Sequence, residues 1–334
     1  MAQQPTVYIA ATAVAPSRTR GWLRALGTQE GVLVLAIVAL FAVVGAVNPR
    51  FIAERNLQSI LLGNAYIAVA AIGMSMVIIS GNIDISVGSL IGVLATLSGS
   101  LAVGGVAVPL CWAIPVVLGI ATMAAMGAIV AYLRIPSIVL TLGMMSVLQG
   151  GLISVTNGAW ISNLPPGFQI GQMAPAGVPM PVWFMVLLTA AAGAWMRLSA
   201  TGRAFYAVGG NAEAAVLSGI SPRRVTVLVF AVHGLFVGIA AVLFATQLSV
   251  IQSTVPPNLV LTIITASVVG GVSILGGSGT VLGSTLAAIL IAAIGSSLIF
   301  VDVSPYWFRA VQGALILLTV LADLARRRRR SAPA

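Results

Sequence analysis

The chain contains no lysine, one cysteine and one histidine among its 334 residues. A P-loop nucleotide site needs a lysine that contacts the phosphates, so this sequence cannot contain one. The single cysteine, Cys111, excludes a framework of intrachain disulfides. One cysteine, one histidine and no paired carboxylates in the apolar segments also leave no credible catalytic set. We therefore expect neither an enzyme nor a metal protein, and no resident cofactor.

Charged residues are also scarce. They make up 7% of the chain, whereas 59% of the residues are hydrophobic. A soluble domain carries about 25% charged residues, so this chain cannot cover a water-facing surface. The net charge of +10 comes entirely from arginine, and the arginines lie near the chain ends and in short loops. This distribution follows the positive-inside rule of membrane proteins and does not indicate a nucleic-acid-binding face.

Ten segments are apolar and long enough, or nearly so, to cross a membrane as helices. The sequence predicts an all-α polytopic membrane protein with about ten transmembrane helices, at residues 31–47, 57–80, 85–103, 108–133, 136–155, 181–196, 225–246, 259–275, 280–300 and 306–324. An even number of spans places both termini on the same side of the membrane.

The arginines assign that side. With ten spans, thirteen of the sixteen arginines lie on the side of the termini, which is then the cytoplasm of a cell inner membrane. Residues 1–30 form a cytoplasmic N-terminal segment, residues 31–324 the transmembrane domain and residues 325–334 a basic cytoplasmic tail. Residues 197–224 form the largest inner loop. The uncharged segment 156–180 is expected as an irregular outer loop, because it is rich in proline and glycine.

The stretch "GNIDISVGS", residues 81–89, interrupts the apolar pattern with one of only six acidic residues, Asp84. If the chain breaks here and a new helix begins, Asp84 or Ser86 can cap its free amides. Alternatively, Asp84 and Asn82 belong to a translocation pathway for a polar solute. The two interpretations are compatible. We assign to this break Asn82, Asp84, Ser86, Gly88 and Ser89.

An internal similarity appears when the chain is shifted by 195 residues. Gly81, Gly88 and Ser89 then fall on Gly276, Gly283 and Ser284, and each set opens an apolar stretch. Interrupted helices at matching positions of two halves are typical of transporters with a pseudo-symmetric core. We therefore expect two pseudo-symmetric halves with broken helices, the second break including Gly276, Gly277, Gly283 and Ser284.

The inner loop contains "GRAFYAVGGNAEAAVLSGI", residues 202–220. Within it, Glu213, Ala214, Ala215 and Gly219 match the pattern E-A-A-x-x-x-G. This pattern resembles the cytoplasmic signature by which permeases of ATP-binding-cassette importers contact their ATPase. An ordinary amphipathic loop helix is the competing interpretation. The candidate coupling residues are Gly202, Arg203, Gly209, Gly210, Asn211, Glu213, Ala214, Ala215 and Gly219.

Taken with "NPRFIAERNL", "MVIISGNIDISVGS", "LRIPSIVLTLGMMSVLQG" and "VVGGVSILGGSGTVLGS", this loop makes the chain resemble a sugar-importer permease of the branched-chain-amino-acid and monosaccharide superfamily. The resemblance implies a separate ATPase subunit that binds ATP, an external sugar-binding protein, and a homodimer or a heterodimer with a related permease, surrounded by lipid. Family members commonly carry acidic residues where this chain has Val260 and Thr262. The outer loop resembles rhamnose-type and autoinducer-2-type permeases more than ribose-type ones.

Neutral polar side chains suit a sugar pathway, and we name Asn64, Gln149, Asn157 and Trp160 as possible solute contacts. Helix packing or interface anchoring is the alternative for each. An ion-coupled secondary transporter is the alternative function. It would need several intramembrane acids or histidines, and this chain offers Asp84 and His233 only.

Overall fold

The computed structural model describes residues 28–256 and 258–331. Within these ranges the chain forms twelve α-helices, a few short 3₁₀ turns and one two-stranded sheet. The predicted all-α class is therefore confirmed. Side chains of residues 326–331 are outside the described set, and so are most of the predicted N-terminal segment, residues 1–27, and the end of the basic tail.

Eight described helices are long and apolar enough to cross a membrane. They are α2 (Gln29–Val47), α3 (Glu54–Ile79), α5 (Val108–Leu133), α6 (Ser137–Thr156), α7 (Met180–Leu198), α10 (Pro222–Thr246), α12 (Val281–Phe300) and α13 (Trp307–Ser331). Two shorter apolar helices, α4 (Val87–Val103) and α11 (Leu259–Val269), occupy the remaining predicted spans. The ten predicted spans thus correspond to eight full-length helices and two short ones.

The inner loop forms two further helices, α8 (Ala200–Gly210) and α9 (Ala212–Leu217). Beyond the other end of the bundle, the predicted irregular loop contains β1 (Trp160–Ile161), which pairs antiparallel with β2 (Ile251–Gln252). Its 3₁₀ turns are η3 (Pro166–Phe168), η4 (Ile170–Gln172) and η5 (Pro175–Gly177), while η2 (Pro49–Ile52) connects α2 to α3.

Helix α3 is the centre of the bundle, and every residue from Ala65 to Ile79 is buried. Helix α10 packs against both α3 and α5. Helices α10 and α5 approach closely where Gly234 meets Gly119. A Cβ on Gly119 would lie only 2.7 Å from the carbonyl oxygen of Gly234. Small residues at such crossings allow backbones to approach, which is how helices associate in lipid. By contrast, few residues of α2, α6 and α13 are buried in the single chain.

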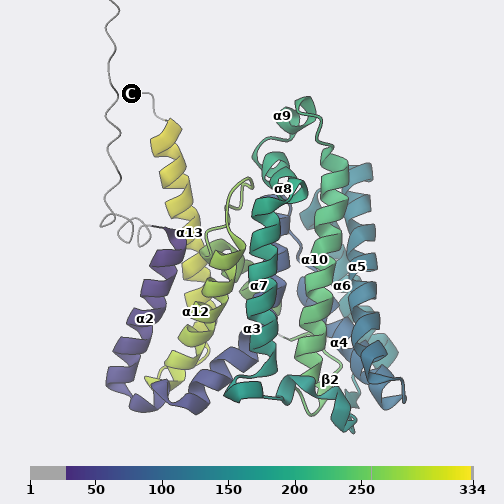
Figure 1. Cartoon of the computed structure of the whole chain (residues 1–334), viewed down its shortest axis with the longest axis vertical. Coiled ribbons are helices and arrows are strands. Elements are labelled where there is room, and N and C mark those ends of the chain that lie inside the picture. The colour runs from purple at the N-terminus through teal and green to yellow at the C-terminus, as the bar shows by residue number, and fades with distance from the viewer. Residues whose placement is uncertain (1–27, 257, 332–334) are drawn as a thin grey trace, which may run out of the picture.

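The first turn of α2 and the last turns of α13 lie near each other at one end of the bundle. The Gln29 amide donates to the carbonyl of Val269, and the Ser273 hydroxyl, in the loop after α11, donates to Asp323 on α13. Figure 1 shows α8, α9 and the C-terminal end of α13 toward the upper end and β2 at the lower end. The two ends of the described chain therefore share a side, as an even number of spans requires. Its assignment to the cytoplasm stays a prediction.

One predicted span is wrong at its end. The apolar segment 259–275 was expected to be helical throughout, but α11 ends at Val269 and an irregular loop follows up to α12. The reason is Gly271, whose φ of +92° ends the helix. The N–H of Gly271 donates to the carbonyl of Val268, and the N–H of Val272 donates to the carbonyl of Ser267. This is the pattern of a glycine-terminated helix. Helix α13, in contrast, is longer than predicted, because it continues beyond residue 324.

Candidate functional site

The break predicted at residues 81–89 separates α3 from α4. Helix α3 ends at Ile79, and Gly81 turns the chain with a φ of +84°. The extended chain that follows is held by α6: the Ser137 hydroxyl accepts from the N–H of Ile83, and the Thr141 hydroxyl accepts from the N–H of Ile85, at 3.1 and 3.0 Å. These bonds satisfy backbone groups that the missing helical turns would otherwise pair.

Asp84 is completely buried at the middle of this break. One carboxylate oxygen accepts from the backbone N–H and the hydroxyl of Ser86, at 2.7 and 2.6 Å. The other lies 3.0 Å from Nε2 of His233 on α10, which is also completely buried. The carboxylate therefore binds the amide just before α4 and joins the break to a neighbouring helix.

The capping expectation needs a correction in its detail. Ser86 precedes α4, but its side chain accepts no hydrogen bond from the first turn of that helix. Its hydroxyl donates to Asp84 instead. Asp84 orders the entry to the helix without bonding the amides of its first turn. The role of Asp84 and Asn82 in a pathway stays a prediction; among the described residues, the side-chain amide of Asn82 bonds only the neighbouring Ser80.

Helices α4 and α11 begin beside each other. A Cβ at Gly88 would lie 2.7 Å from the side chain of Val260 and 3.3 Å from its backbone nitrogen. Ser89, the next residue of α4, is buried. Two short helices therefore start at one level inside the bundle, an arrangement seen where transporter helices are discontinuous. Val260, one of the two positions that depart from the family pattern, lies at this crossing.

The second break shows how far the internal similarity extends. Gly283 opens α12 against the end of α11, and a Cβ there would fall on the carbonyl oxygen of Gly270. Thr280 caps α12 by accepting from the N–H of Gly283 at 3.1 Å. The helix starts thus match in position to within one residue, but their packing partners differ, and the helix ends do not follow the 195-residue shift. Gly81 ends α3 as Gly271 ends α11, so the pairing of Gly81 with Gly276 is wrong there.

Gly276 instead lies directly against Gly81. A Cβ on Gly276 would lie 3.1 Å from the Cα of Gly81. The N–H of Gly277 donates to the carbonyl of Ile79 at 2.8 Å. The end of α8 packs into the same place. We call this contact of three chain segments the glycine joint; it consists of Gly81, Gly209, Gly210, Gly276 and Gly277. Side chains would separate these backbones, since a Cβ at Gly209 would fall on the carbonyl oxygen of Ile79.

Tyr206, one turn before the glycine joint on α8, adds a polar contact to it. Its hydroxyl donates to the carbonyl of Gly279 in the loop before α12, at 3.0 Å. Burial raises the pKa of the Tyr206 hydroxyl, and the positive charge of Arg197 opposes only part of that shift. The hydroxyl therefore stays protonated at neutral pH and donates. Sequence reasoning missed this residue.

The inner loop folds as its polar residues dictate. Ser199 caps α8 by accepting from the N–H of Gly202, which also lacks room for a Cβ beside Met196. Asn211 ends α8 and caps α9 by accepting from the N–H of Ala214. Gly219 ends α9 with a φ of +78°, so the glycine of the E-A-A-x-x-x-G pattern is a helix-terminating residue.

Helix α9 protrudes from the upper end of the bundle (Figure 1). Ala215 is its buried anchor at 3% exposure, whereas Leu217 is 90% exposed. Glu213 and Ala214 are exposed beside it, and Arg203 on α8 is exposed and donates to the carbonyl of Leu198. Among the residues that the structure describes, no ion pair involves Glu213. The docking role of these residues stays a prediction.

The four possible solute contacts form no hydrogen bond with one another within the described residues. Asn64 lies on α3 and bonds the carbonyl of Ile60 in its own helix. Gln149 lies on an exposed part of α6, and Asn157 ends that helix with a φ of +51°. Trp160 is 65% exposed in β1. Their role as solute contacts stays a prediction.

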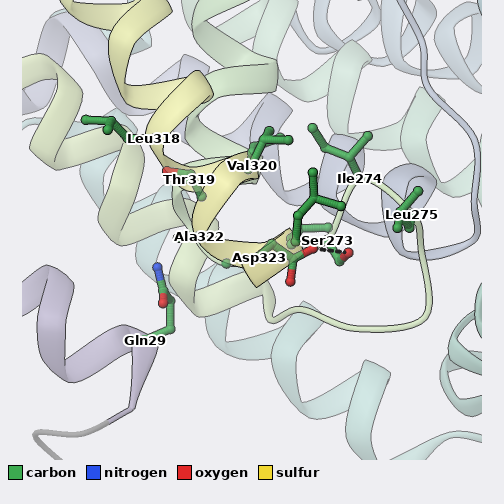
Figure 2. Close-up of a pocket in the computed structure, with 13 residues that line it drawn as sticks. Gln29, Ser273, Ile274, Leu275, Leu318, Thr319, Val320, Ala322 and Asp323 are labelled. Atoms are coloured by element: carbon green, nitrogen blue, oxygen red, sulfur yellow. Dashed lines mark hydrogen bonds between the residues drawn. The ribbon is translucent and has the colours of Figure 1, made fainter. Parts of the chain in front are cut away.

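A cavity of about 480 Å³ lies where the start of α2, the loop after α11 and the end of α13 meet. Figure 2 shows Ser273 and Asp323 joined by a hydrogen bond, and Gln29 on the other side. The remaining walls are mostly aliphatic, including Ile274, Leu275 and Leu318. No group of acidic, histidine or cysteine side chains that could hold a metal ion occurs in the described part of the chain.

The fold and the breaks define a polytopic helical membrane protein of the transporter type. Residues 56–320 match the family model described as the permease component of branched-chain amino acid transport systems, and the chain belongs to this permease family. It is 34% identical over 294 residues to the autoinducer 2 import system permease protein LsrC of Salmonella typhi, covering 88% of this chain and 84% of that protein. It is also 34% identical over 312 residues to the ribose import permease protein RbsC of Escherichia coli K12, covering 91% and 95%. No solved structure gives a significant match.

Proposed function

We propose that this chain forms the solute pathway of an importer for a neutral sugar or sugar-like solute, in a cell inner membrane with both termini in the cytoplasm. A separate ATPase subunit drives it and an external binding protein supplies it. The relatives named for ribose and autoinducer 2 import support the solute class. The absence of lysine from the sequence supports ATP binding by a separate polypeptide, because a P-loop needs that residue.

The observation that carries this proposal is α9. Val216 and Leu217 are 57% and 90% exposed, so two neighbouring apolar side chains on a protruding polar loop are available for burial against a partner. Burying such a side chain contributes about 1.5–3 kcal/mol. Small alanines beside it allow a groove to close around the helix, and Glu213 offers a charged contact. Short helices that lie in a groove of a partner use this combination.

Changing Leu217 to aspartate or Glu213 to arginine should detach the ATPase while the permease remains inserted. Both side chains are exposed, so neither change disturbs the packing of the bundle. Co-purified ATPase per inserted permease should fall about tenfold or more, as for a central interface residue. Leu275→Asp, at another exposed leucine on the same end, is the matched control. ATPase recovery at the parental level from both variants would disprove the docking role of α9.

The glycine joint gives this docking helix a route to the pathway. Helix α8 contacts the end of α3 and the loop before α12, so movement of α8 reaches both breaks through backbone contacts and the Tyr206 hydroxyl. Rigid packed elements transmit such displacements. The proposal therefore includes mechanical coupling through α8.

Tyr206→Phe should leave the ATPase bound but reduce solute uptake per ATP hydrolysed, about fivefold or more on the scale typical of coupling between sites. The change removes one hydrogen bond and no carbon atom. Tyr132→Phe on α5 is the matched control, because the Tyr132 hydroxyl is exposed and forms no hydrogen bond within the described residues. The measurement is uptake and phosphate release in liposomes containing the assembled importer. An unchanged ratio in Tyr206→Phe would contradict coupling through this contact.

A second permease copy, or a related chain, fits the exposed face of α6. Gln149 lies exposed on this mostly apolar helix and forms no hydrogen bond within the described residues. An unbonded amide facing lipid is costly, so a protein or water neighbour is favoured there. Ion-coupled transport is disfavoured, because Asp84 and His233 are fully buried and bonded to each other.

A further inference from the structure

The chain between β2 and α11 enters the bundle without forming a helix. We call residues 252–258, apart from residue 257, which lies outside the described set, the descending segment. Contacts with three glycines of α4 trace its course: Ile251 lies against Gly99, Thr254 and Val255 against Gly92, and Leu259 and Val260 against Gly88. The segment therefore runs along α4, antiparallel to it, from the end of the bundle that carries β2 toward the start of α4.

The depth of this segment follows from neighbouring helices. Leu94, half a turn after Gly92 on α4, contacts Gly119 of α5. Gly119 lies near the middle of α5, about 17 Å from one end and about 21 Å from the other at 1.5 Å per residue. Because α5 crosses the whole bundle, Thr254 lies near the middle of its thickness, and not in a surface loop.

Polar groups of the descending segment lack partners at this depth. The side chains of Thr254 and Asn258 are exposed, and so is that of Gln252, which belongs to β2 at the end of the bundle where the segment begins. Within the described residues, none of the three forms a hydrogen bond, and neither do the backbone N–H groups of Thr254 and Val255. In a bilayer core each such group costs several kcal/mol, so irregular exposed backbone occurs there only when protein or a water-filled cavity surrounds it.

We propose that the descending segment lines the water-filled solute pathway, where Gln252, Thr254 and Asn258 bond the hydroxyl groups of a neutral polyhydroxylated solute. The solute class rests on the function proposed above. A dry apolar face of a second copy would leave the same groups unsatisfied, which disfavours that arrangement. The segment contains no ionisable side chain, and the pair of Asp84 and His233 is fully buried and bonded internally. A neutral ligand therefore fits this wall better than an ion.

Water access to single cysteines tests this proposal. Replacing the buried Cys111 by serine gives a chain without cysteine. Thr254→Cys and Asn258→Cys are then made separately in this background, and Val38→Cys provides the control. Val38 lies mid-way along α2 and is 59% exposed. Its variant therefore provides a cysteine at similar depth on a helix that faces lipid. Each variant is expressed with the full importer and treated from the β2 side with a charged methanethiosulfonate reagent that does not cross membranes.

We expect both pathway variants to react at least about tenfold faster than Val38→Cys, because the charged reagent partitions poorly into hydrocarbon. Reaction no faster than the control in the variants that insert would overturn the proposal. Disulfide formation between two copies at Thr254→Cys without reagent access would also overturn it, since the segment would then form a subunit interface. Labelling requires neither ATPase nor solute. Loss of ATPase docking would therefore count against the proposed function and leave this test intact.

Discussion

Replacing Asp84 by leucine should leave little folded permease in the membrane. The carboxylate accepts from two groups of Ser86 and pairs with His233, and all three residues are fully buried. Leucine removes every one of these bonds and leaves a buried imidazole, amide and hydroxyl without partners. Losing one member of a buried pair costs about 3–5 kcal/mol, a large fraction of the stability of most proteins. The measurement is the amount of permease in the membrane fraction and its melting temperature in detergent.

Asp84→Asn should insert nearly normally and retain part of the transport activity. Its amide oxygen accepts from Ser86, and its NH₂ group can donate to His233 once the imidazole adopts the tautomer that accepts at Nε2. Uptake normalised to inserted protein distinguishes the two roles of this residue. A well-inserted but inactive Asp84→Asn variant would make the carboxylate charge part of the transport mechanism, contrary to the structural role expected here.

Combining Asp84→Leu with His233→Leu provides the control for the pair. Replacing both partners of a buried polar contact by apolar groups is less damaging than removing one of them. The double variant should therefore accumulate to a higher level than Asp84→Leu alone. It will stay below the parent, because the groups of Ser86 remain unpaired.

The local features of this site could be predicted from the sequence, and its long-range partners could not. The break itself was predictable because Gly81, Asn82 and Asp84 interrupt an apolar run. His233 lies 149 residues away from Asp84, and no local pattern connects them. The sequence offered this histidine only as one of two ionisable groups in the apolar segments, and the structure bonds it to Asp84. The glycine joint could not be predicted from the sequence either, because its glycines belong to three separate motifs that come together only in the tertiary fold.

Most helices were predictable because lipid requires long apolar segments, and α5 agrees with its prediction at both ends. The failure at α11 has a physical cause. Its apolar residues continue beyond the helix as far as Leu275, so hydropathy cannot detect the end; only the pair Gly270 and Gly271 indicates it. The descending segment was equally hidden, because its depth depends on contacts with α4 rather than on its own composition.

Replacing Gly283 by leucine should be severely damaging, and more so than replacing Gly88. A Cβ at Gly283 would fall on the backbone carbonyl of Gly270, which is fixed by the end of α11. A Cβ at Gly88 would mainly meet the side chain of Val260 at 2.7 Å, and a side chain can move more easily than backbone. Overpacking typically costs about 1–3 kcal/mol, and the unyielding backbone places Gly283→Leu at or above that range.

The yield of inserted permease and its melting temperature should therefore fall in the order Gly63→Leu, Gly88→Leu, Gly283→Leu. Gly63 is the matched control, since a Cβ there meets nothing within 4 Å. A second comparison isolates the cause at the first break: Val260→Ala removes the methyl group that obstructs a side chain at position 88. It should restore much of the stability lost in Gly88→Ala, because little except the Val260 side chain obstructs that site. A silent Gly283→Leu variant would show that α11 and α12 separate easily, and the close crossing of the second break would then have no structural importance.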